Sequence, residues 1–168
     1  MVGDSPLHWF FAVFTISFTV GGSIDASHEL IHRHEYFCKV ISYVNLWFYQ
    51  FTVYPMEHLY MHHKKVGTSD DPVTSPKNQS IYTYYVNVIA SAYKFNFNFN
   101  KLYFVLCVVS TLSYNLLAIA LSMGHERWLG RALFMIAFSY MSLFLMECVE
   151  YIEHYGLIYR KDKDDPIN

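Results

Sequence analysis

Charged side chains are scarce in this sequence. Asp, Glu, Lys and Arg together make up 15% of its 168 residues, whereas soluble chains average about 25%. Hydrophobic residues reach 54% and aromatic residues 19%. This composition disfavours a water-soluble globular domain and indicates a membrane protein of one domain. The net charge of −2, without any basic patch, excludes nucleic acid as a natural partner.

Cysteines and sorting signals are also few. The three cysteines, Cys38, Cys107 and Cys148, follow no CxxC spacing, so neither a disulfide framework nor a zinc knuckle is indicated. The N-terminal stretch lacks Lys and Arg, and a cleavable signal peptide is not expected. Repeats and low-complexity linkers are absent, which predicts a single domain over residues 1–168. A short Phe/Asn alternation at 95–100 is typical of an interfacial strand or a turn.

Long apolar runs, by contrast, are present. Residues 7–24, 102–123 and 132–149 are nearly free of charge and predict membrane-spanning helices. A further apolar stretch, 40–56, is interrupted by Asn45, Gln50 and Pro55, so we expect it to lie in the interface or to re-enter the membrane. The predicted fold is therefore all-α, a multi-pass transmembrane helical bundle.

The distribution of basic residues predicts the topology of this bundle. If 40–56 crossed the membrane, four Lys and Arg residues would lie on one side and eight on the other. With three spans the split is ten to two, which fits the positive-inside rule better. The helix ends on the side that carries ten Lys and Arg residues are therefore predicted to face the cytoplasm. The ten are Arg33, Lys39, Lys64, Lys65, Lys77, Lys94, Lys101, Arg160, Lys161 and Lys163, and the two are Arg127 and Arg131.

Histidines gather on the same predicted side. In the central segment 58–63, His58 and His62 would share one face of a helix, with His63 beside them. A second pair with the same spacing follows the first span, and one more histidine follows the last. Neutral imidazole is the commonest metal-ligating side chain. The predicted ligands are His28, His32, His58, His62, His63 and His154.

Six imidazoles exceed the three or four protein ligands of a zinc site. A two-metal centre fits their number better, and iron suits an imidazole-rich, oxygen-using membrane site, with zinc and copper left open. Acidic residues interleave with the histidines and are candidates to accept hydrogen bonds from the other ring nitrogen of each ligand. The interleaved acids are Glu29, Glu57, Asp70, Asp71, Glu150 and Glu153, and the preferred candidates among them are Glu29, Glu57, Asp71 and Glu153.

A rival enzyme class is indicated by residues 28–32. His28, Glu29 and His32 satisfy the HExxH pattern of zinc peptidases, in which the glutamate activates a zinc-bound water. Only three positions of this pattern are fixed, however. It also assigns no role to the histidines of segment 58–63 or to His154, and we therefore consider it the weaker interpretation.

Three motifs occur in a set order: HELIHR at 28–33, EHLYMHHKKVGTSDDPVTS at 57–75 and EYIEHYGL at 150–157. With these motifs the chain resembles the membrane-bound alkane hydroxylase (alkane 1-monooxygenase) branch of the fatty acid desaturase superfamily. The HxxxHH spacing of the second motif separates this branch from acyl-lipid desaturases, in which HxxHH is usual. The resemblance covers almost the whole chain.

The resemblance implies a non-haem di-iron monooxygenase. Such enzymes hold two iron ions with histidines, take O2 as co-substrate and insert one oxygen atom into a C–H bond of a hydrocarbon chain. The first motif would contribute His28 and His32, the second His58, His62 and His63, and the third His154. No catalytic residue beyond these ligands is assigned. The implied partners are an alkyl-chain substrate, membrane lipid and a rubredoxin-like or other electron carrier.

The chain also departs from the family pattern. A further HxxHH box normally follows EHYGL, and extra spans precede HELxH, but neither is found here. We therefore expect an incomplete bundle, either a fragment or a degenerate copy. Three alternatives to the alkane hydroxylase remain: a fatty acyl or sterol desaturase or hydroxylase, an inactive truncated membrane protein, and the HExxH zinc peptidase.

Overall fold

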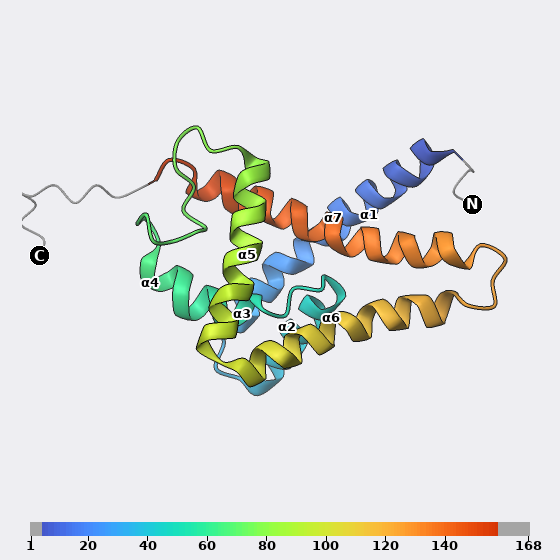
Figure 1. Ribbon diagram of the computed structural model, residues 1–168, viewed down its shortest axis with the longest axis horizontal. Helices are drawn as coiled ribbons and strands as arrows, with labels where there is room; N and C mark the ends of the chain where they lie inside the picture. Colours follow the sequence, from blue (N-terminus) through green and yellow to red (C-terminus); the bar gives the residue numbers. More distant parts are fainter. Residues whose placement is uncertain (1–4, 158–168) are drawn as a thin grey trace, which may run out of the picture.

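The computed structural model describes residues 5–157 (Figure 1). Three of the basic residues used for the topology, Arg160, Lys161 and Lys163, lie outside this range. Within it the structure contains helices and no strand, which confirms the all-α prediction. The helices are α1 (Pro6–Ile31), α2 (Tyr36–Phe48), α3 (Tyr54–Glu57), the π-helix η1 (His58–His62), α4 (His63–Lys65), α5 (Ile81–Phe99), α6 (Lys101–Ser122) and α7 (Trp128–His154).

Three helices, α1, α6 and α7, are long and apolar enough to cross a membrane. They cover the runs from which spans were predicted. Their starts follow from capping chemistry. At α1, the Ser5 hydroxyl accepts the backbone N–H of Leu7 and proline occupies the first turn, while at α6 the Asn100 side chain accepts the N–H of Tyr103. The interfacial or re-entrant placement of 40–56 stays a prediction, although α2 is not one of these three helices.

Helices α1 and α7 run side by side in the same direction (Figure 1). Near their N-terminal ends the rings of Trp9 and Phe134 meet edge to face at 5.7 Å. Further along, the Ser17 hydroxyl donates to the backbone carbonyl of Phe138 at 3.2 Å. Both helices therefore bring their C-terminal ends to one side of the molecule. That arrangement places the HELIH and EHYGL segments next to each other.

The Phe/Asn alternation at 95–100 was wrongly predicted to be a strand or turn, since α5 is helical through Phe99. The side chains pair at helical spacing: Phe95 stacks on Phe99, four positions on, at 5.1 Å. Asn96 is fully buried, and its amide donates to the carbonyls of Ala92 and Val53. Burial of Asn96 against the 49–53 turn thus outweighs the low helix propensity of asparagine.

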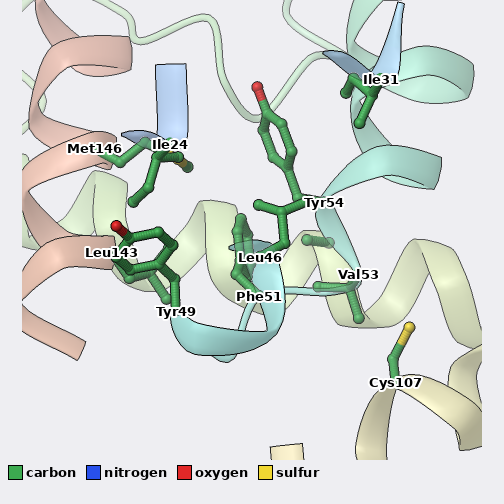
Figure 2. Packing of buried hydrophobic residues seen from close by; sticks show 11 residues of the cluster. Ile24, Ile31, Leu46, Tyr49, Phe51, Val53, Tyr54, Cys107, Leu143 and Met146 are labelled. Atoms are coloured by element: carbon green, nitrogen blue, oxygen red, sulfur yellow. The ribbon is translucent and has the colours of Figure 1, made fainter. Parts of the chain in front are cut away.

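The turn between α2 and α3 forms the centre of the hydrophobic core. Tyr49, Phe51 and Val53 are each 1% exposed and pack with Ile24, Leu143 and Met146 in Figure 2. Backbone outside a helix needs hydrogen-bond partners at membrane depth. Side chains of the long helices donate to it: the Ser139 hydroxyl to the carbonyl of Phe48 and the Tyr103 hydroxyl to that of Thr52. The core thereby fixes the start of the 54–65 segment.

Removing one of these donors should destabilise the fold. In Tyr103→Phe the buried carbonyl of Thr52 loses a hydrogen bond of 2.6 Å and keeps only the weaker one from the Cys107 thiol at 3.4 Å, which costs about 0.5–1.5 kcal/mol. We expect a lower midpoint of thermal unfolding in detergent, followed by tryptophan fluorescence. Tyr82→Phe, at a tyrosine that is 72% exposed, is the matched control. Equal midpoints for the two variants would contradict this role of Tyr103.

Candidate metal centre

The six predicted histidines meet where the C-terminal ends of α1 and α7 face the 58–63 segment. They form two adjacent groups with ligand atoms within 4.8 Å of one another inside each group. His28, His32, His58 and His63 make up the first group, and His62 and His154 belong to the second together with Glu150. The rings of His58 and His62, one from each group, are 5.2 Å apart between centroids. The arrangement provides two neighbouring places for a metal ion.

The division between the groups arises from the π-helix. The backbone N–H of His63 donates to the carbonyl of His58, five positions back. This wider turn brings Nε2 of His63 to 2.8 Å from Nε2 of His58. The sequence spacing had placed His58 and His62 on one α-helical face. In the structure His58 instead pairs with His63, and His62 belongs to the other group. Single π-turns inside α-helices are often found at functional sites.

The first group consists of crowded imidazoles. The ring centroids of His28 and His58 are 4.5 Å apart, and those of His32 and His63 are 4.8 Å apart. Burial and the neighbouring histidines lower the pKa of His58 to about 2, and the same causes lower the pKa of His32 and of His63. These rings are therefore neutral at physiological pH. Their lone pairs are available to a metal without loss of a proton.

His62 is oriented by Asp71, one of the acids predicted to support a metal ligand. Its Nδ1 donates to the Asp71 carboxylate at 2.9 Å, which leaves Nε2 as the ligand atom. Burial opposes protonation of His62, but the hydrogen bond and charge of Asp71 outweigh it and raise its pKa. Burial also acts on Asp71, whose pKa is nevertheless lowered by hydrogen bonds from His62 and Thr74.

His154 is oriented by its own helix. Its Nδ1 donates to the backbone carbonyl of Glu150 at 2.9 Å, one turn earlier. The other ring nitrogen, Nε2, is thereby left for a metal. The ring lies 4.9 Å from that of His62 between centroids. The second group therefore has two histidines with fixed tautomers and one carboxylate.

The loop of residues 66–80, which carries Asp71, is fastened to the end of α7. The backbone N–H of Gly156 donates to the carbonyl of Ser75 at 2.7 Å, and the Tyr151 hydroxyl donates to the carbonyl of Gln79 at 2.6 Å. Gly156 has φ +72°, and a Cβ there would lie 3.1 Å from the Lys77 side chain. The glycine of EHYGL thus permits the close approach of loop and helix.

The other predicted acids occupy different environments. Glu57 is 2% exposed, and burial raises its pKa to about 8, with Asp71 and Glu150 adding to the shift and His62 opposing it. Glu29 and Glu153 are exposed and line a cavity of about 310 Å³ beside His28. Glu147, fully buried on α7, was not predicted. Its position one turn before Glu150, on the face that carries His154, was the available signal.

The donor set of both groups fits metal ions that accept imidazole. Four imidazoles in one group, and two imidazoles with a carboxylate in the other, suit iron or zinc. Fold and site together therefore define a class: an α-helical protein with three candidate membrane spans and a candidate two-metal histidine centre at one end of them.

The chain belongs to the fatty acid desaturase family, whose model matches residues 5–168. It is 30% identical to alkane 1-monooxygenase 1 of Pseudomonas aeruginosa, over 94% of this chain and 43% of that protein. It is also 30% identical to alkane 1-monooxygenase 2 of the same organism, over 92% and 43%. Identity to the alkane 1-monooxygenase of Ectopseudomonas oleovorans is 24%, over 97% and 44%. The chain thus spans less than half the length of these curated relatives.

Proposed function

We propose that this chain contributes to a non-haem di-iron monooxygenase that hydroxylates the C–H bonds of an alkane or of a terminal alkyl chain. The observation that carries the proposal is the pair of histidine groups at the ends of apolar helices, in a chain similar to alkane 1-monooxygenases. Two iron ions bound there would supply activation of O2. The overall reaction takes RH, O2, two electrons and two protons to ROH and water.

Each histidine has a role in this proposal. His28, His32, His58 and His63 would hold one ion, and His62 and His154 would hold the other. Asp71 would keep Nδ1 of His62 protonated, so that Nε2 faces the ion. The HExxH pattern then has a different meaning, because His28 and His32 act with His58 and His63. This leaves Glu29 and Glu153 at the mouth of the 310 Å³ cavity.

An alkyl chain can approach along the seam between α1 and α7. A cavity of about 330 Å³, lined by Phe18, Gly21 and Gly22, shares Asp25, Met146 and Val149 with the cavity beside His28. A Cβ built on either glycine meets nothing within 4 Å, so both glycines keep this space open. A hydrocarbon lying in this cavity would exclude water and would present its end to the histidines.

The surroundings of the site complete the proposal. We infer that the histidine end faces the cytoplasm, which the excess of Lys and Arg on that side supports. The spans would then be close to 7–24, 102–123 and 132–149, within lipid. Electrons would come from a rubredoxin-like or other carrier, for which the exposed Lys64 and Lys65 beside His63 offer positive charge.

Product analysis tests the proposed function. The full chain, purified in detergent and loaded anaerobically with Fe²⁺, is given O2, a reductant and either an alkane or a fatty acyl substrate. We expect about two iron ions per chain and a primary alcohol from the alkane by gas chromatography with mass spectrometry. Protein treated with a chelator is the control. An alkene from the acyl substrate alone would favour a desaturase, whereas one zinc ion and no iron would contradict the proposal.

A further inference from the structure

Three glutamates, Glu57, Glu147 and Glu150, crowd against the second histidine group. Glu57 and Glu147 are each 2% exposed. Oε1 of Glu57 and Oε2 of Glu147 have no hydrogen-bond partner. The side chain of Glu150 is 13% exposed. Carboxyl groups this deeply buried are costly unless a positive charge or a set of hydrogen bonds compensates them.

The groups that face these carboxyls compensate them only in part: Nδ1 of His154 lies 3.5 Å from Oε2 of Glu150. The charges acting on Glu57 are those of His62, Asp71 and Glu150, and His62 is already committed to Asp71. Tyr54 reaches Glu150 with a long hydrogen bond of 3.4 Å. Tyr84 is fully buried with an unpartnered hydroxyl, and burial together with the charges of Glu147 and Glu150 raises its pKa. His62 and His154 therefore face several acids in this buried pocket, and Nδ1 of each is already engaged, by Asp71 and by the backbone carbonyl of Glu150 respectively.

The geometry around Glu150 suits a cation. Its carboxylate oxygen and the ligand atoms of His62 and His154 all lie within 4.8 Å of one another. Ligand atoms that each sit about 2.0–2.2 Å from a common ion must be within about 4.4 Å of one another. Small side-chain adjustments satisfy this condition. The two histidines come from η1 and α7, so an ion here would join the central segment to the last helix.

We propose that the second group is a mixed imidazole–carboxylate metal site in which Glu150 is a ligand and the buried Glu57 and Glu147 provide counter-charge. This rests on the proposed function, since it concerns one of the two proposed ions. The first group offers four imidazoles, whereas the second offers two imidazoles and a carboxylate oxygen. The two sites are therefore chemically inequivalent, and the second prefers the harder, more highly charged cation.

Titration with Co²⁺ tests this proposal without recourse to activity, because the visible spectrum of Co²⁺ reports its ligands. The wild-type chain in detergent is expected to bind two ions. In Glu150→Gln the affinity of one site should fall more than about 100-fold, beyond the effect typical of residues that only support a ligand. The double variant Glu57→Gln/Glu147→Gln should keep two sites, one of them weakened by about 10–100-fold.

Two further measurements separate ligation from a structural role. Glu150→His, which restores a donor atom, should bind the second ion more tightly than Glu150→Gln. X-ray absorption of Co²⁺ bound to the wild-type chain should show oxygen as well as imidazole nitrogen ligands, with no substitution needed. Glu126→Gln, at an exposed glutamate in the α6–α7 turn, is the matched control.

Two negative outcomes can be told apart. Two sites of unchanged affinity in Glu150→Gln, with absorption showing imidazole alone, would overturn the role of Glu150 and leave the proposed function standing. A wild-type chain that binds neither Co²⁺ nor iron would overturn both.

Discussion

Replacing His58 should remove the metal ion of the first group and reduce metal content from two ions per chain to one. His58 is the central ring of that group, 4.5 Å from the ring of His28 and 4.4 Å from that of His63. Loss of one ligand should weaken binding by more than the 10–100-fold that follows loss of a supporting residue. We expect this for His58→Gln, measured as metal per chain by plasma mass spectrometry after gel filtration.

The choice of glutamine limits structural side effects. His58 is 3% exposed and stacks on Tyr54 at 4.8 Å, so truncation to alanine would leave a cavity. His34→Gln is the matched control, because His34 is exposed and belongs to neither group. If His58→Gln retained two ions per chain while folding like the control, the first group would not be a metal site.

The long helices could be predicted from the sequence because each is an uninterrupted apolar run. The apolar runs 7–24 and 102–122 lie within α1 and α6, because nothing inside them competes with helix formation. Helix α5 is different. Its buried residues Tyr84, Val88, Ala92 and Asn96 recur every four positions, but tyrosines, asparagines and a lysine on the other faces mask the amphipathic pattern.

The histidines that gather at the candidate site could also be predicted from the sequence. Their division into two groups could not. Topology alone gathers the histidines, because α1 and α7 end on one side. Which imidazoles share an ion depends on the π-turn at His58, and π-turns have no reliable residue signature. The same limit applies to Glu150. Its carboxylate joins His62 only because the 66–80 loop and α7 are fastened together, through contacts between residues more than 70 positions apart, such as Tyr151 with Gln79.

Asp71→Asn should lower the affinity of the second group for its metal ion by about 10–100-fold. This is the usual effect of removing a carboxylate that orients a ligating histidine. Asp71 is 2% exposed. Its Oδ2 accepts Nδ1–H of His62 at 2.9 Å and the Thr74 hydroxyl at 2.6 Å, while Oδ1 accepts the N–H of Val73. Asparagine keeps the shape and one acceptor but removes the charge that holds the proton on Nδ1. A larger share of His62 then carries its proton on Nε2, where it blocks the metal.

The neighbouring Asp70 gives this prediction a control within one residue. Asp70 is exposed, so Asp70→Asn removes the same charge from the same loop without changing what His62 contacts. Competition between each variant and a chromogenic chelator for Co²⁺ should show a weakened second site in Asp71→Asn alone. The first site should be unchanged in both, because its four imidazoles do not include His62. Equal weakening in the two variants would mean that general loop charge, rather than the tautomer of His62, governs the second site.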